Sequence, residues 1–195
     1  NIYSKYFGGA WMKIFMEKNC EFYSNFNQSK FTIVRHSNTY GPYDKYDLEK
    51  SHVFGATITK IMNAKSSVKV WGDGSEIRDF LYVNDLSRFI ELAIKKQKSK
   101  YKIYNVGSGR TISINKIVKL LGGKKIFIPK RPGEPDITFA DIKKLKKDVN
   151  WKPKMSIEKG IKIILKSLYY WQDAPVWTPE KIKKATKKWF FYLKK

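Results

Sequence analysis

Ala10–Tyr43 reads AWMKIFMEKNCEFYSNFNQSKFTIVRHSNTYGPY, and this stretch decides the fold. Its first half predicts a helix with one apolar face, formed by Met12, Phe15, Met16 and Phe22. The run Phe31–Val34 then predicts a short buried strand. Polar residues follow the strand at once, in Arg35-His36-Ser37-Asn38. Open α/β sheets bind ligands at the carboxyl ends of their strands, so the pattern predicts an α/β fold with a site just after Val34.

The polar residues around this strand form a spaced motif. Lys13 and Glu17 lie one helical turn apart, and Arg35 follows Lys13 by 22 positions. The strand end then reads Arg-x-x-Asn-x-Tyr-Gly-Pro, from Arg35 to Pro42. This pattern resembles the extended short-chain dehydrogenase/reductase family, in particular its NAD-dependent epimerases and dehydratases of nucleotide sugars. Those enzymes carry Tyr-x-x-x-Lys-x-x-x-Glu on a helix and Arg-x-x-Asn-x-Tyr-Gly-Pro after it.

One position departs from the family pattern. The family tyrosine, which moves the proton that accompanies hydride transfer, should stand four residues before Lys13, and this chain has Gly9 there. Tyr6 lies seven residues before Lys13, about 10 Å along an unbroken helix. A break at Gly8-Gly9 would let Tyr6 fold inward and act as the base. Tyr6 as a catalytic residue, Tyr6 as ordinary packing, and a base that is absent or elsewhere all remain open.

The resemblance implies a cofactor and its contacts. NAD or NADP would exchange a hydride with a carbon of the sugar. Lys13 would hold the ribose and bias the catalytic hydroxyl, while Asn38 and the turn Tyr40-Gly41-Pro42 would shape the nicotinamide end. The family's glycine-rich phosphate-binding turn, Gly-x-x-Gly-x-x-Gly, does not occur ahead of Lys13. We therefore expect the chain to be the C-terminal part of a longer enzyme and to be inactive by itself.

A histidine stands at the start of the next predicted helix, Val53–Met62. His52 follows Asn38 by 14 positions, after a loop that contains aspartates. Within the family, this segment is similar to the GDP-L-fucose synthases, in which the histidine is an acid/base group beside the keto sugar. An unperturbed imidazole titrates at about pH 6.5, so it exchanges protons readily near neutrality. His52 is therefore either a catalytic and substrate-binding residue or a polar residue that begins a helix.

The most specific motif runs from Gly72 to Asp85, GDGSEIRDFLYVND. It is similar to the family's Gly-x-Gly-x-x-x-Arg-Asp-x-x-Tyr-Val-x-Asp, in which the arginine binds the diphosphate of the nucleotide sugar. Arg78 would take that role, with Gly72 also at the substrate, because a planar guanidinium pairs two phosphate oxygens at once. Asp85 is predicted to be a structural N-cap of the helix Leu86–Lys95.

A second phosphate-binding segment is predicted at Arg131-Pro132-Gly133-Glu134. It resembles the family's Arg-Pro-Gly-Asp/Glu, in which the arginine holds phosphate and the acid bonds the ribose hydroxyls. The alternative is a surface loop with a local ion pair. If Arg78 and Arg131 clamp one diphosphate, both must share a cleft with Lys13.

The rest of the chain alternates between predicted strands and helices. Strands are expected on either side of the turn Gly72-Asp73-Gly74, at 101–106 and at 124–129, and helices at 114–121, 140–149 and 157–168. We therefore expect an α/β fold: the C-terminal part of a Rossmann-type doubly wound parallel sheet, a smaller α/β substrate domain and a helical tail. The dinucleotide-binding remnant would comprise 1–39 and 79–106, the nucleotide-sugar-binding domain 40–78 and 107–168, and the tail 169–195.

Composition limits the partners. The formal net charge is +23, but only five residues are arginine, so lysine supplies the excess. Strong basicity can indicate nucleic-acid or membrane binding. No zinc-ligand spacing, RNP aromatic signature or continuous basic arm is present, so we interpret the lysines as a solvated surface without a nucleic-acid or metal site. Cys20 is the only cysteine; it excludes an intrachain disulfide and fits a reducing cytoplasm.

No apolar run approaches the roughly 18 residues of a membrane span. In the tail, apolar and aromatic residues recur at helical spacing among lysines from Thr178 onward, which predicts an amphipathic helix docked on the body or on a partner subunit, with a membrane surface as the alternative. The resemblance also implies a homodimer through the Lys13 helix.

Three functions are compatible with the sequence. The first is an NAD(P)-dependent nucleotide-sugar epimerase, dehydratase or epimerase-reductase. The second, suggested by Gly9, is a non-catalytic sensor of nucleotide sugars or dinucleotides on the same scaffold. The third is a basic RNA- or membrane-binding fragment, whose affinity for polyanions would fall steeply with salt.

Overall fold

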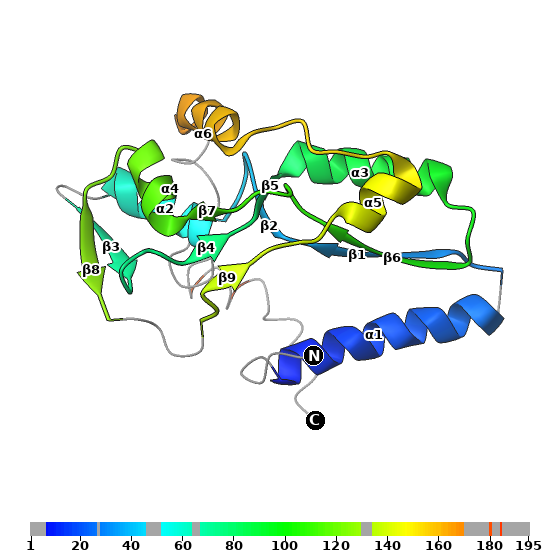
Figure 1. Ribbon diagram of the computed structural model, residues 1–195. Coiled ribbons are helices and arrows are strands. Elements are labelled where there is room, and N and C mark those ends of the chain that lie inside the picture. Colours follow the sequence, from blue (N-terminus) through cyan, green and yellow to red (C-terminus); the bar gives the residue numbers. More distant parts are fainter. Residues whose placement is uncertain are drawn as a thin grey trace.

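The computed structural model describes residues 7–26, 28–45, 52–63, 67–129 and 134–169, together with Glu180 and Lys184. Strands and helices alternate along these residues (Figure 1). In chain order they are α1 (Phe7–Phe26), β1 (Phe31–His36), β2 (Asn38–Tyr40), α2 (Val53–Asn63), β3 (Val68–Trp71), β4 (Ile77–Arg78), β5 (Phe80–Tyr82), α3 (Val83–Lys96), β6 (Tyr101–Val106), β7 (Ile112–Ser113), α4 (Ile114–Leu120), β8 (Lys125–Ile128), β9 (Ile137–Thr138), α5 (Lys143–Val149) and α6 (Ile157–Lys166). Tyr6, Arg131 and nearly all of the tail lie outside the described residues.

Two stretches of strand change partners part-way along their length. β1 pairs in parallel with β6, and after Ser37 the chain continues as β2, which pairs in parallel with β5. In the same way Asp79 separates β5 from β4, which lies between β7 and β9. The sheet therefore parts at Ser37 and Asp79. This parting lies near the predicted domain boundaries at 39/40 and 78/79, which stay a prediction.

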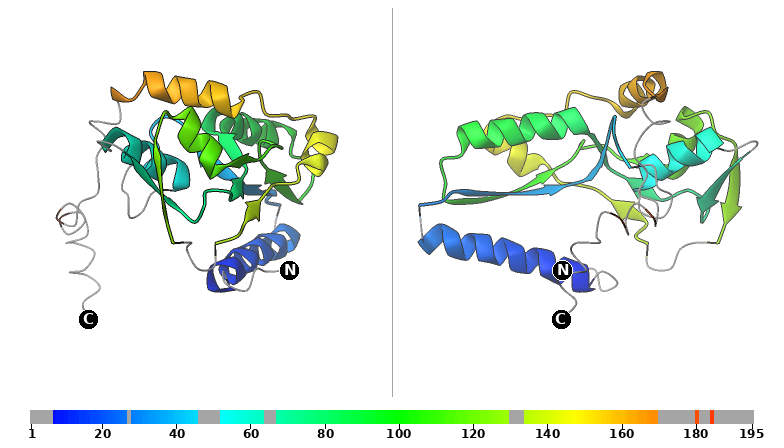
Figure 2. Two further views of the ribbon diagram at one scale, coloured as in Figure 1. Left: turned by 60° about the vertical axis from the view of Figure 1, so that its left-hand side comes forward. Right: turned by 180° about the vertical axis from the view of Figure 1, so that it is seen from behind.

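The β1–β6 pair lies between two layers of helix. α1 runs along one face of the pair, and α3 and α5 lie on the other (Figures 1 and 2). β3 and β8 form a further parallel pair at the far end of the molecule. Parallel strands covered by helices on both faces are the α/β arrangement predicted from the sequence.

β5 supplies side chains to two hydrophobic cores, because successive residues of a strand point to opposite faces. Phe80 and Tyr82 enter the first core, and Leu81 enters the second. The first core joins β2, β5, α2, α4 and α6 through Tyr40, Phe54, Ile58, Ile117, Leu121, Ile161 and Ile164. The second joins β6, α3 and α5 through Phe89, Ala93, Tyr104, Val106, Ile142, Leu145 and Trp151.

Two predicted helix starts are wrong. α3 begins at Val83, and Asp85 lies in its first turn instead of at the N-cap. The Asp85 carboxylate is buried and accepts hydrogen bonds from the backbone N–H groups of Lys154 and Met155, so it joins α3 to the segment before α6. The helix predicted from residue 140 begins only at Lys143.

The apolar stripe of α1 faces away from the sheet. Phe15 and Met16 are 66% and 65% exposed, whereas Ser24 is buried and the Glu17 carbonyl accepts a hydrogen bond from the Tyr101 hydroxyl of β6. α1 begins at Phe7 and runs through Gly8 and Gly9, so the proposed helix break there is wrong. Among the described helices, none combines the length and apolar character needed to cross a membrane.

Candidate functional site

A cleft of about 440 Å³ opens where β1 ends and the strands part. It brings Asn38 and His52 together, which the sequence placed in separate motifs. The side chains that shape it include Arg35, Ser37, Asn38, Thr39, His52 and Thr138. Because this is the carboxyl end of the parallel β1–β6 pair, the cleft occupies the position at which α/β folds bind ligands.

The buried carboxylate of Asp79 connects the segments that surround this cleft. Its Oδ1 accepts hydrogen bonds from Ser37 Oγ at 3.2 Å and from Ser108 N and Oγ at 2.8 and 2.7 Å. Its Oδ2 accepts from Ala140 N at 3.3 Å. A Cβ at Gly107 would overlap Asp79 Oδ2 and lie 2.6 Å from Ala140 Cβ, so this approach requires glycine. One side chain thus ties together the chain after β1, β6 and β9.

Asn38 is fixed at the edge of the parting. Its backbone N and its side-chain Nδ2 both donate to the carbonyl oxygen of Asp79, at 3.2 and 3.3 Å. These bonds orient the side-chain amide. Within the described residues its Oδ1 makes no hydrogen bond, which leaves an acceptor for a ligand hydroxyl.

His52 stands exposed immediately before α2, as predicted. Near it lies Asp44, and burial raises the pKa of this carboxyl above its ordinary value, while the hydrogen bond from Lys45 N and the nearby His52 oppose the rise. A second histidine, His36, also lines the cleft, with Nδ1 2.9 Å from Ser37 O and 3.2 Å from Thr39 Oγ1. Sequence reasoning gave no role to Asp44 or His36, although both flank the Asn-x-Tyr-Gly-Pro motif.

Arg78 and Glu134, both predicted to bind the substrate, contact each other. The Arg78 Nη2–Glu134 Oε1 distance is 3.1 Å, and Arg78 Nη1 donates to the carbonyl oxygens of Ile77 and Asp136 at 2.9 and 3.2 Å. The arginine is only 5% exposed. This buried ion pair joins β4 to the segment before β9, whereas Arg131, for which a local ion pair was the alternative, lies outside the described residues.

The comparison with known protein families decides the family. Residues 10–107 match the model of the NAD dependent epimerase/dehydratase family. The chain belongs to this family. It is 36% identical over 166 residues to the GDP-L-colitose synthase of Yersinia pseudotuberculosis, which covers 79% of this chain and 53% of the relative. The chain spans about half the length of the curated relatives that it matches.

Solved structures of epimerases share the fold. The UDP-glucose 4-epimerase of Thermotoga maritima, solved with UDP-glucose, has a TM-score of 0.72 at 26% identity over 80% of this chain and 52% of that chain. A UDP-glucuronic acid 4-epimerase from Bacillus cereus has a TM-score of 0.66 at 29% identity, over 78% of this chain and 50% of that one. It was solved with UDP-4-deoxy-4-fluoro-glucuronic acid and NAD. The predicted family and Rossmann-type fold are confirmed.

Within this epimerase/dehydratase chain, Glu17 and Arg35 fasten the lysine helix to the cleft. Arg35 Nε donates to Glu17 Oε1 at 2.7 Å and Arg35 Nη2 donates to Oε2, a paired contact that lowers the pKa of Glu17. Lys13 is exposed one turn earlier on the same face of α1. That end of α1 lies beneath the parting of the sheet (Figure 1).

Tyr40 and Gly72, the remaining predicted positions, have contacts that stabilise the fold. Tyr40 is 2% exposed and packs on Phe54, with ring centroids 4.5 Å apart, so its side chain belongs to the core. Neither Gly41 nor Pro42 is among the residues that line the cleft. Gly72 ends β3 with a φ of 63° and donates to the Ile128 carbonyl. Their cofactor and substrate contacts stay predictions.

Proposed function

We propose that this chain forms the substrate-binding part of an NAD(P)-dependent nucleotide-sugar epimerase or dehydratase. The observation that carries the proposal is the meeting of Asn38 and His52 in one cleft at the carboxyl end of β1. The family match and the nucleotide sugars bound in similar structures support nucleotide sugars as the substrate class.

The residues of the cleft fit the nicotinamide end of a dinucleotide. Asn38 Oδ1 offers an acceptor, Ser37 and Thr39 supply hydroxyls, and Lys13 adds a cation one turn from the rim. NAD supplies hydride acceptance and return when it is bound. Lys13 would donate to the ribose hydroxyls, and Asn38 would orient the carboxamide end or the sugar.

His52 is proposed to move a proton on the sugar. Oxidation of a sugar carbon to a ketone acidifies the neighbouring C–H bonds, and an exposed imidazole beside that carbon can remove and return the proton. Asp44 lies near His52. We propose that its carboxyl group orients the imidazole.

Arg78 is proposed to contact the diphosphate, with Arg131 as its partner. Three protein acceptors already hold the Arg78 guanidinium. A diphosphate would therefore share it with Glu134 or displace that carboxylate. Glu134 would then be free to bond a ribose hydroxyl.

Isotope exchange tests the proposal directly. The chain is incubated in D₂O with UDP-glucose or UDP-glucuronic acid and NAD or NADP, and deuterium in the sugar is followed by NMR, while calorimetry measures binding. Binding of a nucleotide sugar that weakens in Asn38→Ala, with any exchange lost in His52→Gln, supports it. Absence of binding for every sugar tested, or binding indifferent to Asn38→Ala, contradicts it.

A non-catalytic sensor is the second candidate, and Gly9 is the observation that favours it. A Cβ at Gly9 or Gly8 would meet nothing within 4 Å, so packing does not require glycine where the family has its tyrosine. Gly9→Tyr and Tyr6→Phe separate the two functions. In an enzyme that uses Tyr6, Tyr6→Phe abolishes cofactor reduction; in a sensor, neither substitution produces any reduction although ligand binding persists.

We also propose that the protein is a cytoplasmic homodimer that pairs through α1. The exposed stripe includes Met12, Phe15, Met16 and Phe26, and an apolar face of this kind supports an interface between two copies of the chain. Sedimentation equilibrium should give a dimer that Phe15→Glu dissociates. A monomeric wild-type chain contradicts this part of the proposal.

A further inference from the structure

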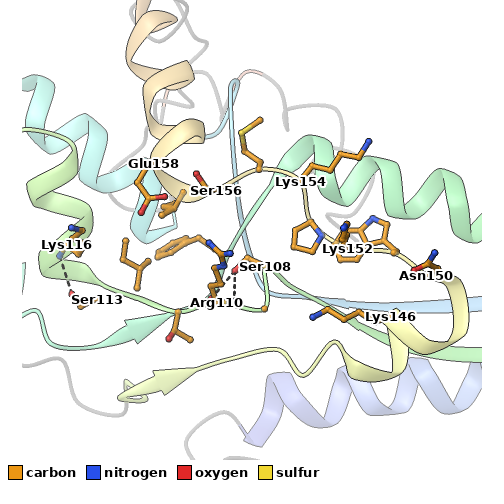
Figure 3. Close-up of a pocket in the computed structure, with 18 residues that line it drawn as sticks. Ser108, Arg110, Ser113, Lys116, Lys146, Asn150, Lys152, Lys154, Ser156 and Glu158 are labelled. Carbon is orange, nitrogen blue, oxygen red and sulfur yellow. Dashed lines mark hydrogen bonds between the residues drawn. The ribbon is translucent and has the colours of Figure 1, made fainter.

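A second cavity lies on the other side of Asp79 from the cleft. Its volume is about 870 Å³, and it opens between α4, α6, the loop after β6 and the segment that joins α5 to α6 (Figure 3). It shares no lining residue with the cleft. Ser37 of the cleft and Ser108 of this cavity donate to the same oxygen of Asp79, so the two hollows are separated by that buried carboxylate. We call it the basic cavity.

Cations dominate the lining of the basic cavity. Its charged side chains are Arg110, Lys116, Lys146, Lys152, Lys154 and Glu158, five cations against one carboxylate. They come from separate elements and approach the cavity from two sides (Figure 3). Across the part of the chain that the structure describes, none of the five cations forms an ion pair. Such a cluster repels itself and attracts an anion.

The wall that carries two of these lysines is built in advance. Asp85 of α3 accepts hydrogen bonds from the backbone N–H groups of Lys154 at 3.0 Å and Met155 at 2.9 Å. Arg88 of α3 donates to the carbonyl oxygen of Lys152 at 2.9 Å. The backbone is therefore held from behind, while the ammonium groups of Lys152 and Lys154 stay exposed. A fixed backbone lowers the entropy cost of binding a ligand.

The floor of the basic cavity is apolar and aromatic. Phe80 and Trp151 line it and are themselves 5% and 4% exposed, and Ile112 lies beside them. The volume falls within the range of roughly 300–1,000 Å³ that small-molecule sites occupy. Apolar floor and cationic rim together match a ligand that carries a ring and phosphate groups.

We propose that the basic cavity binds a phosphorylated small molecule with a ring, such as a nucleoside diphosphate, at a site separate from the cleft. The phosphates lie among the lysines and Arg110, and the ring packs on the apolar floor. Glu158, on the rim near Lys116 and Arg110, favours ligands that also carry a hydroxyl to donate.

Titration calorimetry with pyrophosphate and with UDP, in the absence of NAD, tests this site. The cavity variant is Lys116→Gln/Lys146→Gln/Lys152→Gln. The matched control, Lys119→Gln/Lys143→Gln/Lys162→Gln, removes the same charge from exposed positions on α4, α5 and α6 that do not line the cavity. We expect the cavity variant to bind UDP about tenfold more weakly or worse, and the control to bind like the wild type. UDP should bind more tightly than pyrophosphate, because only UDP carries a ring.

Three results would overturn the proposal. The first is no binding of either probe to the wild-type chain. The second is an equal loss in the cavity and control variants, or equal competition by RNA, which would indicate a diffuse attraction to polyanions. The third is UDP binding that Asn38→Ala or Arg78→Lys weakens and the cavity variant does not, which would place UDP at the substrate site of the proposed function. Far-UV circular dichroism of both variants checks that the exposed substitutions leave the fold intact.

Discussion

Asp79→Ala should lower the stability of the chain by weakening the junction at which the strands part. The carboxylate accepts four hydrogen bonds, two of them short, from Ser108 N and Oγ at 2.8 and 2.7 Å, and two longer, from Ser37 Oγ and Ala140 N at 3.2 and 3.3 Å. A hydrogen bond to a charged group contributes about 1.5–3 kcal/mol. The Ser108 hydroxyl keeps a second acceptor, the Arg110 carbonyl at 2.9 Å, which reduces its loss. We therefore expect the free energy of unfolding to fall by about 3 kcal/mol.

Urea unfolding followed by far-UV circular dichroism measures this loss. Asp79→Asn keeps an acceptor for Ser108 but turns its NH₂ towards the Ala140 N–H, so we expect a loss of about 1–2 kcal/mol. It also provides a measurable variant if Asp79→Ala does not fold. Asp141→Ala is the control, because its carboxylate is exposed and accepts one local bond from Lys143 N. If Asp79→Ala costs no more than Asp141→Ala, the carboxylate does not hold the junction together.

Two further substitutions test other contacts. The hydrogen bond from Arg35 lowers the pKa of Glu17, so the ionised carboxylate contributes its full stability above the ordinary pKa of 4.5 and loses it as the pH falls through the lower folded pKa. In urea titrations the difference in unfolding free energy between wild type and Glu17→Gln should therefore close below pH 4.5. A difference that does not change with pH would contradict the ion pair. Gly160→Ala should destabilise the chain by about 2 kcal/mol, because its Cβ would overlap the Tyr40 hydroxyl. Adding Tyr40→Phe should restore much of that loss, because it removes the overlapping hydroxyl, which within the described residues has no hydrogen-bond partner to lose. Thermal melts of the single and double variants measure this, and additive losses would refute the overlap.

Patterns over short distances in the chain predicted most of the secondary structure. The apolar run at Phe31–Val34 became β1, and the helices predicted at 53–62 and 114–121 became α2 and α4. Ser113, just before α4, caps it with a hydroxyl that accepts from Lys116 N. These features depend on hydrogen bonds and side-chain faces within a few residues, which is the range that a sequence pattern records.

The predicted cleft was partly accessible to the same reasoning. Asn38 and His52 meet because one follows a parallel strand and the other begins the next helix, and both positions lie at the carboxyl edge of the sheet. Asp85 was misassigned because an aspartate before an apolar run fits an N-cap equally well. Its partners, Lys154 and Met155, lie 69 and 70 residues away.

The amino-acid sequence alone determined the alternation of strands and helices, the family of the chain and the polar residues after β1. Only the tertiary structure decided that Asp79 joins three strand ends, that Arg78 pairs with Glu134, that the apolar stripe of α1 faces outward and that five cations line a second cavity. The physical reason is range: local patterns set the backbone, whereas a buried charge or a cavity exists only when segments far apart in the chain converge on it.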